Sequence, residues 1–123
     1  MMRALQFAPQ AMADIETILR WSFQTFGVAA EVRYNALIRQ GLIDLQMDAS
    51  RAGVTSLEEF GIGVFYYRLQ FSRQSVSKSV GRVRSSPHVI VFQILKDQSV
   101  MIGRVLHERQ KLTSSLRDDF RVD

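Results

Sequence analysis

The chain has 123 residues, of which 46% are hydrophobic and 23% charged, and this composition fits one globular domain and excludes a disordered protein. It has no cysteine, which excludes disulfide bonds, thiolate metal sites and a cysteine nucleophile. The net charge is +4. We find neither a signal-peptide pattern nor an apolar stretch long enough to span a membrane, and we therefore expect a cytoplasmic protein without membrane contact.

The first 27 residues predict a short strand followed by a helix. Arg3–Phe7 alternates weakly, as a half-buried strand does. Pro9 suits the first turn of a helix, and Gly27 can take the left-handed conformation that ends one. Between them the apolar side of the helix recurs at helical spacing in Ala11, Ile15, Ile18, Leu19 and Ser22.

A second helix follows almost at once, so the two helices should form an antiparallel hairpin. Its apolar stripe is Ala30, Tyr34, Leu37, Gly41 and Leu45, and four charged residues lie off that stripe, namely Glu31, Arg33, Arg39 and Asp44. Since glycine is costly inside a helix, we expect Gly41 to permit close packing against the first helix.

The segment from Ala49 to Gly63 predicts a connecting loop, because it is small, polar and contains three glycines. One helical turn is expected at Ser56–Phe60, where Ser56 and Glu59 have the spacing of a capping box.

The hydrophobic period changes to two in the second half of the chain, which predicts strands. We expect a half-buried strand at Val64–Phe71 and a polar, serine-rich loop or irregular edge at Ser72–Ser86. Val89–Leu95 is a continuous apolar run, typical of a strand covered on both faces, and Val100–Leu106 is its returning partner after the turn Lys96–Ser99.

The predicted fold class is therefore α+β, in the order β-α-α-β-β-β. A small antiparallel sheet of three to four strands carries the N-terminal helical hairpin on one face, and the first strand is added back to the sheet. Residues 1–109 should form one domain, and residues 110–123 a C-terminal extension that is a short helix or a flexible tail.

The positive charge is concentrated in the predicted sheet half. Residues 61–109 contain eight Lys or Arg against two acids, whereas residues 1–60 contain five Arg against seven acids. Such a field favours an anionic partner, either nucleic acid or an acidic protein segment. We expect the arginine-bearing face of the sheet, opposite the helices, to be open to that partner.

The sequence offers few groups for catalysis and no motif for a metal or cofactor. His88 and His107 should meet at the far ends of the last two strands, close to Arg84. Such a cluster could bind phosphate and move a proton, as in a metal-independent ribonuclease, or the histidines could simply cap strand ends. Arg104 lies inside an apolar strand, so we expect it to pair with Asp14 or Glu16 in preference to a surface contact. Trp21, Tyr66 and Tyr67 lie in periodic segments and are interpreted as packing residues.

The order of these residues resembles the ParE branch of the RelE/ParE toxins of bacterial toxin–antitoxin pairs. Four matching pieces together cover about residues 3–109. The first is Ala13–Ile18 with Trp21-Ser22 and Phe26-Gly27, and the second is Ala29-Ala30 with Tyr34, Ile38, Leu42 and Leu45. The third is Val83-Arg84 with Pro87–Phe92, and the fourth is Ile102–His107.

The resemblance implies a non-enzymatic, growth-inhibiting toxin that poisons DNA gyrase and is neutralised by a ParD-like antitoxin in a hetero-oligomer. The flexible, often acidic tail of such an antitoxin wraps the toxin along a groove between helices and sheet. Residues expected to bind antitoxin or target are Arg68, Arg73, Arg82, Arg84, His88, Arg104 and His107. No cofactor or metal is expected, and direct binding of nucleic acid is the less favoured alternative.

Two other functions remain open on the same fold. RelE-like members cleave messenger RNA on the ribosome, and the catalytic candidates for that activity here are Arg82, Arg84, Arg104 and His107. A chain that has kept the fold but lost toxicity would act only as an antitoxin-binding module.

Overall fold

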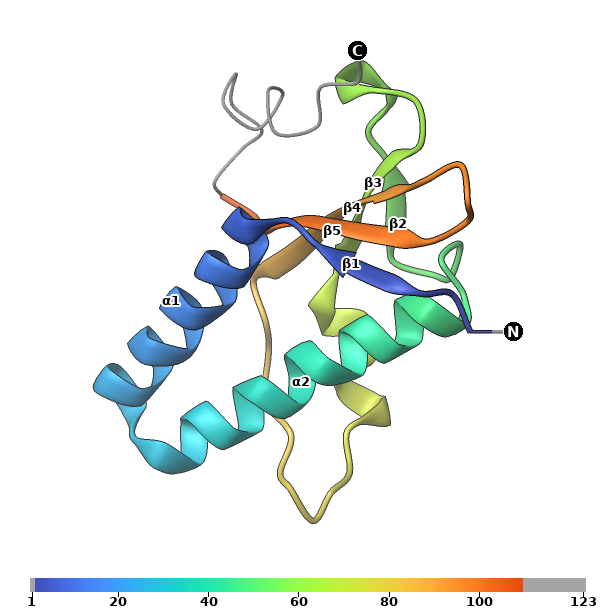
Figure 1. The fold of residues 1–123 in the computed structure, drawn as a ribbon. Helices are drawn as coiled ribbons and strands as arrows, with labels where there is room; N and C mark the ends of the chain where they lie inside the picture. Colours follow the sequence, from blue (N-terminus) through green and yellow to red (C-terminus); the bar gives the residue numbers. More distant parts are fainter. Residues whose placement is uncertain (1, 110–123) are drawn as a thin grey trace.

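The computed structural model describes residues 2–109. Two helices form a hairpin against one face of a twisted sheet (Figure 1). In chain order the elements are β1 (Leu5–Phe7), α1 (Pro9–Phe26), α2 (Val28–Met47), β2 (Val54–Ser56), the 3-10 helix η1 (Glu58–Phe60), β3 (Val64–Arg68), the 3-10 helix η2 (Leu69–Ser75), β4 (His88–Ile94) and β5 (Val100–His107). The extension predicted over residues 110–123 lies outside the described residues.

The α+β class and the helical hairpin on one face of the sheet are confirmed, but the sheet is larger than predicted. It contains five strands in the order β1-β5-β4-β3-β2. β1 joins the sheet as predicted, yet it runs parallel to β5, with Leu5 opposite Val100. Two helices and three strands separate β1 from β5 in sequence, so no tight turn forces them to run in opposite directions.

The fifth strand, β2, lies inside the segment that was predicted to be a loop. Val54, Thr55 and Ser56 are too few to show a period of two, and they form a strand by pairing with the longer β3. The helical turn predicted at Ser56–Phe60 is present as η1, but the capping box is wrong. η1 starts after Leu57 and has no side-chain cap, because Ser56 belongs to β2.

The hairpin turns on a single residue. Pro9 starts α1 as predicted, and Gly27, with φ at 95°, is the one residue between α1 and α2.

Gly41 lies where α2 approaches η2 and β4 closely. A Cβ at Gly41 would lie 2.4 Å from Leu69 Cδ2 and 3.5 Å from Ile90 Cδ1. The glycine therefore permits close packing against η2 and β4, whereas the prediction was close packing against α1.

Among the helices of residues 2–109, none combines the length and the hydropathy that a membrane span needs.

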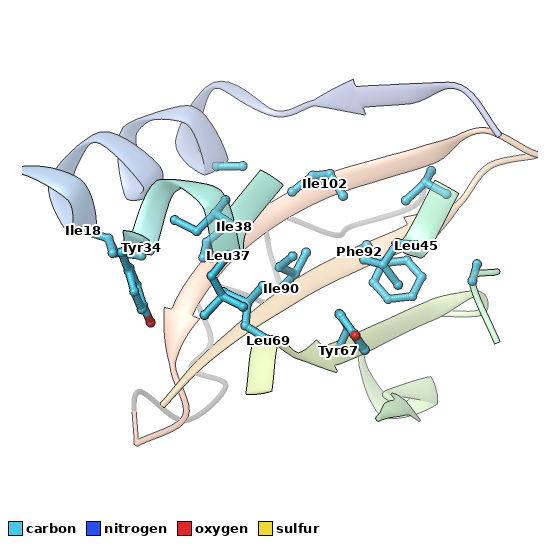
Figure 2. Packing of buried hydrophobic residues seen from close by; sticks show 14 of the residues in the cluster. Ile18, Tyr34, Leu37, Ile38, Leu45, Tyr67, Leu69, Ile90, Phe92 and Ile102 are labelled. Carbon is cyan, nitrogen blue, oxygen red and sulfur yellow. The ribbon is translucent and has the colours of Figure 1, made fainter. Parts of the chain in front are cut away.

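The main core lies between the hairpin and the sheet, where Leu37 and Ile38 of α2 pack over β4 and β5 (Figure 2). Ile90 and Phe92 of β4 point into this core. Val89 and Val91 belong to a second apolar cluster, so the predicted burial of this strand on both faces is confirmed.

That second cluster corrects the prediction of an open, arginine-bearing sheet face. Besides Val89 and Val91 it contains Leu57, Val64 and Leu106, and all five side chains are buried. Because Leu57 precedes η1 and packs on this cluster, the β2–η1 segment helps to shield the face opposite the hairpin.

β3 ends at Arg68, three residues before the predicted end, because the chain turns into η2 and buries Ser72. The Ser72 hydroxyl donates to Asp44 Oδ2 at 2.6 Å, and its oxygen lies 2.7 Å from the Tyr67 hydroxyl, which donates to it. Asp44 also pairs with Arg51 at 2.9 Å. Asp44, predicted to lie off the buried stripe, is in fact buried, and the start of the Ser72–Ser86 segment is tied to the core.

Candidate functional site

A groove of about 1070 Å³ lies between the helical hairpin and the segment that leads into β4. It is lined by the middle and end of α1, the first two turns of α2, residues 81–88 and the last residue of β5. The side chains that give the groove its chemistry are Trp21, Phe26, Arg33, Tyr34, Arg82, Arg84, His88 and His107.

One wall of the groove is aromatic. Trp21 and Phe26 meet edge to face with ring centroids 5.5 Å apart, and they are 55% and 67% exposed. Ser22 is the residue of this turn that faces the core, so its neighbour Trp21 lies on the flank of α1. The interpretation of Trp21 as a packing residue is therefore wrong, whereas Tyr67 is buried as predicted. Exposed aromatic pairs of this kind are typical of protein-binding surfaces.

A chain of hydrogen bonds crosses the inner end of the groove. The Tyr34 hydroxyl lies 2.7 Å from Ser86 Oγ and also contacts His88 Nδ1. His88 in turn faces His107 across the β4–β5 pair, with ring centroids 5.7 Å apart. The predicted meeting of the two histidines is thus confirmed, and His107 Nδ1 accepts the Arg109 backbone N–H at 3.0 Å.

Burial keeps His88 and Tyr34 uncharged at neutral pH. Burial, and after it the charge of His107, lowers the pKa of His88 from 6.5 to about 4. Burial raises the pKa of Tyr34 to about 12, against the opposing effect of the hydrogen bond with Ser86. Both side chains are neutral near pH 7, and they present polar atoms without charge.

The rim of the groove is cationic. Arg33, Arg82 and Arg84 line it, and none of the described residues that line it carries a carboxylate. Arg82 is held in place because its guanidinium donates to the carbonyls of Val76 and Gln74. The left-handed Gly81, with φ at 99°, brings this segment against the Arg33 side chain. The groove therefore favours an anionic, partly apolar ligand.

The structure gathers four of the seven predicted binding residues and leaves three elsewhere. Arg82, Arg84, His88 and His107 line the groove. Arg68 is exposed at the end of β3, and Arg73 Nε donates to the Val83 carbonyl at 2.7 Å, so that it braces the segment before Arg84.

Arg104 pairs with Asp14, the first of the two acids predicted for it. Its Nε lies 2.8 Å from Asp14 Oδ2, and the same oxygen accepts the Val105 backbone N–H at 2.9 Å. β1 pairs with β5 only as far as Ile102, so β1 offers no acceptor for the Val105 N–H farther along β5, and the Asp14 carboxylate accepts it instead. Arg104 consequently joins α1 to β5 and does not line the groove.

Sequence reasoning missed four groove residues. Trp21 was interpreted as a packing residue and Tyr34 was assigned to the apolar stripe of its helix, and Phe26 and Arg33 were not singled out as binding residues. The available signal was the group of three large aromatics, Trp21, Phe23 and Phe26, within six residues of the predicted hairpin turn, which is more apolar surface than one turn can bury.

The described residues contain no group of three or more His, Asp or Glu side chains that could hold a metal ion. His88 and His107 alone provide two nitrogen ligands, which is fewer than a zinc site uses.

Comparison with known proteins identifies a family and a solved structure of similar fold. The family model described as the ParE toxin of the type II toxin–antitoxin system, parDE, matches residues 5–112. A solved structure described as the chromosomal ParDE TA system from P. aeruginosa is similar to this chain at 20% sequence identity and a TM-score of 0.60. The match covers 86% of this chain and 96% of that one, and it shows a common fold. No curated protein matches the chain.

Proposed function

Because the chain belongs to the ParE toxin family of type II toxin–antitoxin systems, we propose that it inhibits growth until a cognate ParD-like antitoxin fills its groove. The observation that carries this proposal is the composition of the groove. An aromatic wall formed by Trp21 and Phe26 faces a rim of arginines that has no carboxylate of its own. An amphipathic acidic segment supplies the matching groups, namely apolar side chains for the wall and carboxylates for the rim.

The proposed target is DNA gyrase, which the toxin reaches in the cytoplasm and inhibits by binding, without covalent chemistry. Two features support a binding toxin. A general acid–base catalyst works best with a pKa near the working pH, whereas the pKa of His88 is about 4. Arg104 and Arg82, two of the four catalytic candidates, are already held by Asp14 and by backbone carbonyls.

The test is a supercoiling assay with purified gyrase, relaxed plasmid and increasing amounts of the full chain. Inhibition together with trapped, cleaved plasmid is the expected result, and prior addition of the antitoxin should abolish it. The antitoxin to use is the product of the adjacent reading frame. Full supercoiling with no cleaved plasmid would remove gyrase as the target and leave family membership untouched.

The alternative function is a RelE-like, ribosome-dependent ribonuclease. The observation in its favour is the contact between His88 and His107 in a groove that also contains Arg84. Primer extension on messenger RNA during expression of the toxin separates the two functions. Codon-phased cuts that disappear in Arg84→Ala and His107→Ala would replace the gyrase proposal with this one.

A third outcome concerns toxicity itself. Overexpression of the chain without the antitoxin should slow growth. If growth is unchanged while the antitoxin still binds, the chain is an antitoxin-binding module that has kept the fold.

A further inference from the structure

The face of the sheet that points away from the helical hairpin carries Val64, Val89, Val91 and Leu106, and we call these four residues the outer face. It is buried at both ends. Val64 is fully buried at one end beside Leu57, and Val89 and Leu106 are 8% and 6% exposed at the other. Val64 and Val89 lie four positions apart in the β3–β4 ladder, which is about 13 Å. An element that covers one end therefore does not reach the other.

The two ends differ in what covers them. The Leu57 backbone N–H donates to the Val64 carbonyl at 2.8 Å, so the β2–η1 segment lies over that end. Within residues 2–109, Leu57 is the only hydrophobic residue of this cluster that comes from outside β3, β4 and β5. β1 stops pairing before it reaches Leu106. Because side chains on a bare sheet face point into water, the low exposure of Val89 and Leu106 requires a further cover.

The chain itself continues at this second end. The Glu108 N–H donates to the Pro87 carbonyl at 2.7 Å, which fixes the exit of the chain beside the start of β4. Residues 110–123 follow, and they reach about 20 Å as a helix and farther when extended. The outer face measures about 13 Å along the strands and about 10 Å from β5 to β3. Residues 110–123 are therefore long enough to cross it.

The sequence of this segment has the pattern that a cover needs. Leu112, Leu116 and Phe120 follow one another at intervals of four residues. This interval places them on one face of a helix, and it also places them on one face of a strand. Ser115 and Arg117 lie off that face in both conformations. The segment thus presents three large apolar side chains to the same side, whichever conformation its backbone takes.

We propose that residues 110–123 fold back over the outer face, with Leu112, Leu116 and Phe120 packed against Val89 and Leu106. Burial of these side chains favours the closed arrangement through the hydrophobic effect. The C-terminal extension is then part of the folded domain, and the outer face is not available to another protein. The inference is independent of the proposed function, because it holds whatever fills the groove.

The first test uses the lack of cysteine in this chain, which allows a single reactive thiol to be placed anywhere. Leu116→Cys and the matched control Ser115→Cys are made in the full-length protein and treated with a soluble thiol reagent. In the folded protein Leu116→Cys should react about tenfold more slowly than Ser115→Cys, because its thiol must wait for the segment to open. In about 6 M urea the two rates should become equal.

The second test observes the contact directly in the wild-type chain. Nuclear Overhauser spectra should show cross-peaks from the methyl groups of Val89 or Leu106 to Leu116 or to the Phe120 ring. Leu116→Asp should remove these cross-peaks and lower the melting temperature by about 5 °C or more.

The control for this variant is Ser115→Asp, which adds the same charge one residue away and should leave both the cross-peaks and the melting temperature unchanged.

Three results would overturn the proposal. Equal labelling rates of the two cysteine variants in the folded protein, without the cross-peaks, would show that the segment does not cover the outer face. A melting temperature unaffected by Leu116→Asp would show that its burial contributes nothing. Protection of Leu116→Cys that appears only as the protein concentration rises would assign the cover to the C-terminal segment of a second copy.

Discussion

His88 and His107 face each other across β4 and β5, with ring centroids 5.7 Å apart and interplanar geometry close to perpendicular. Tyr34 of α2 reaches the same point and contacts His88 edge to face at 5.3 Å. The inner end of the groove is therefore the place where α2, β4 and β5 meet, and changes there should affect both stability and binding.

Protonation of His88 should make the fold less stable in mild acid. Above pH 6.5 His88 is neutral in the folded and unfolded chains, and its contribution is complete. Between pH 6.5 and about 4 the unfolded chain binds a proton that the folded chain does not, so stability falls, and below about 4 the loss is complete. Allowing for partial exposure of the ring, we expect a loss of about 1–3 kcal/mol.

Urea unfolding near pH 7 and near pH 4.5 measures this loss. The decrease in stability should be smaller in His88→Gln than in the wild type. It should persist for the most part in His107→Gln, because burial is the main cause of the lowered pKa of His88. Equal decreases in all three proteins would show that His88 is not responsible.

Removal of the Tyr34 hydroxyl should weaken the joint between α2 and the sheet. Tyr34→Phe leaves the ring in place but deletes the contacts with Ser86 and His88, at a cost of about 1–2 kcal/mol in the free energy of unfolding. Tyr66→Phe is the matched control, because the Tyr66 hydroxyl bonds to no described residue. If chemical denaturation gives the two variants the same stability, the buried hydrogen-bond chain contributes nothing.

Neutralising Asp14 should loosen α1 from β5 while the strand edge stays satisfied. Asp14→Asn removes the charge that holds Arg104 but keeps an oxygen for the Val105 N–H, and it should cost about 1–3 kcal/mol. In Asp14→Ala the Val105 amide should also exchange its hydrogen faster. The exposed Glu16, changed to Gln, serves as control and should stay within about 0.5 kcal/mol of the wild type. An unchanged melting curve for Asp14→Asn would contradict the prediction.

Trp21 should contribute to binding much more than to folding. Its side chain is 55% exposed, so Trp21→Ala should change stability by less than about 1 kcal/mol while it lowers affinity for the antitoxin about 30-fold or more. Phe23→Ala is the control, because Phe23 is comparably exposed on the same helix and lies outside the groove. Calorimetric titration with the C-terminal peptide of the neighbouring antitoxin measures both. Equal affinities for the two variants would exclude the groove.

Arg84 and Arg68 carry the same charge, but we expect Arg84 to affect the rate of antitoxin binding more, because only Arg84 lines the groove. Arg84→Glu places an acid on the groove rim and should slow association with the same peptide roughly tenfold at low salt. Arg68→Glu makes the same charge change at the end of β3, outside the groove, and should have a smaller effect. Stopped-flow rates over a range of salt concentrations measure this difference. A wild-type rate that is independent of salt would show that charge does not guide the encounter.

The features predicted correctly are those determined by local pattern and short connections. The long apolar periods specified α1 and α2, and the Lys96–Ser99 turn specified the β4–β5 pair, which brings His88 to His107. The pairing of Arg104 with Asp14 was also predictable, because a cation inside an apolar strand needs a carboxylate.

The features missed depend on partners distant in sequence. The serines after Phe71 suggest solvent, yet Ser72 is buried because Asp44, 28 residues earlier, accepts its hydroxyl hydrogen. β2 exists only because β3 pairs with it. The groove forms where α1, α2 and residues 81–88 converge, and no local pattern specifies that meeting or the exposure of Trp21.

The parallel pairing of Leu5 with Val100 has a consequence for synthesis. β1 emerges from the ribosome first, but its hydrogen-bonding partner is translated nearly a whole domain later. Closing so long a stretch of chain is slow, and the sheet cannot be completed on the nascent polypeptide before β5 has emerged. The groove wall at His107 forms last of all. Until β5 has emerged, the groove that we propose to receive the antitoxin is therefore incomplete.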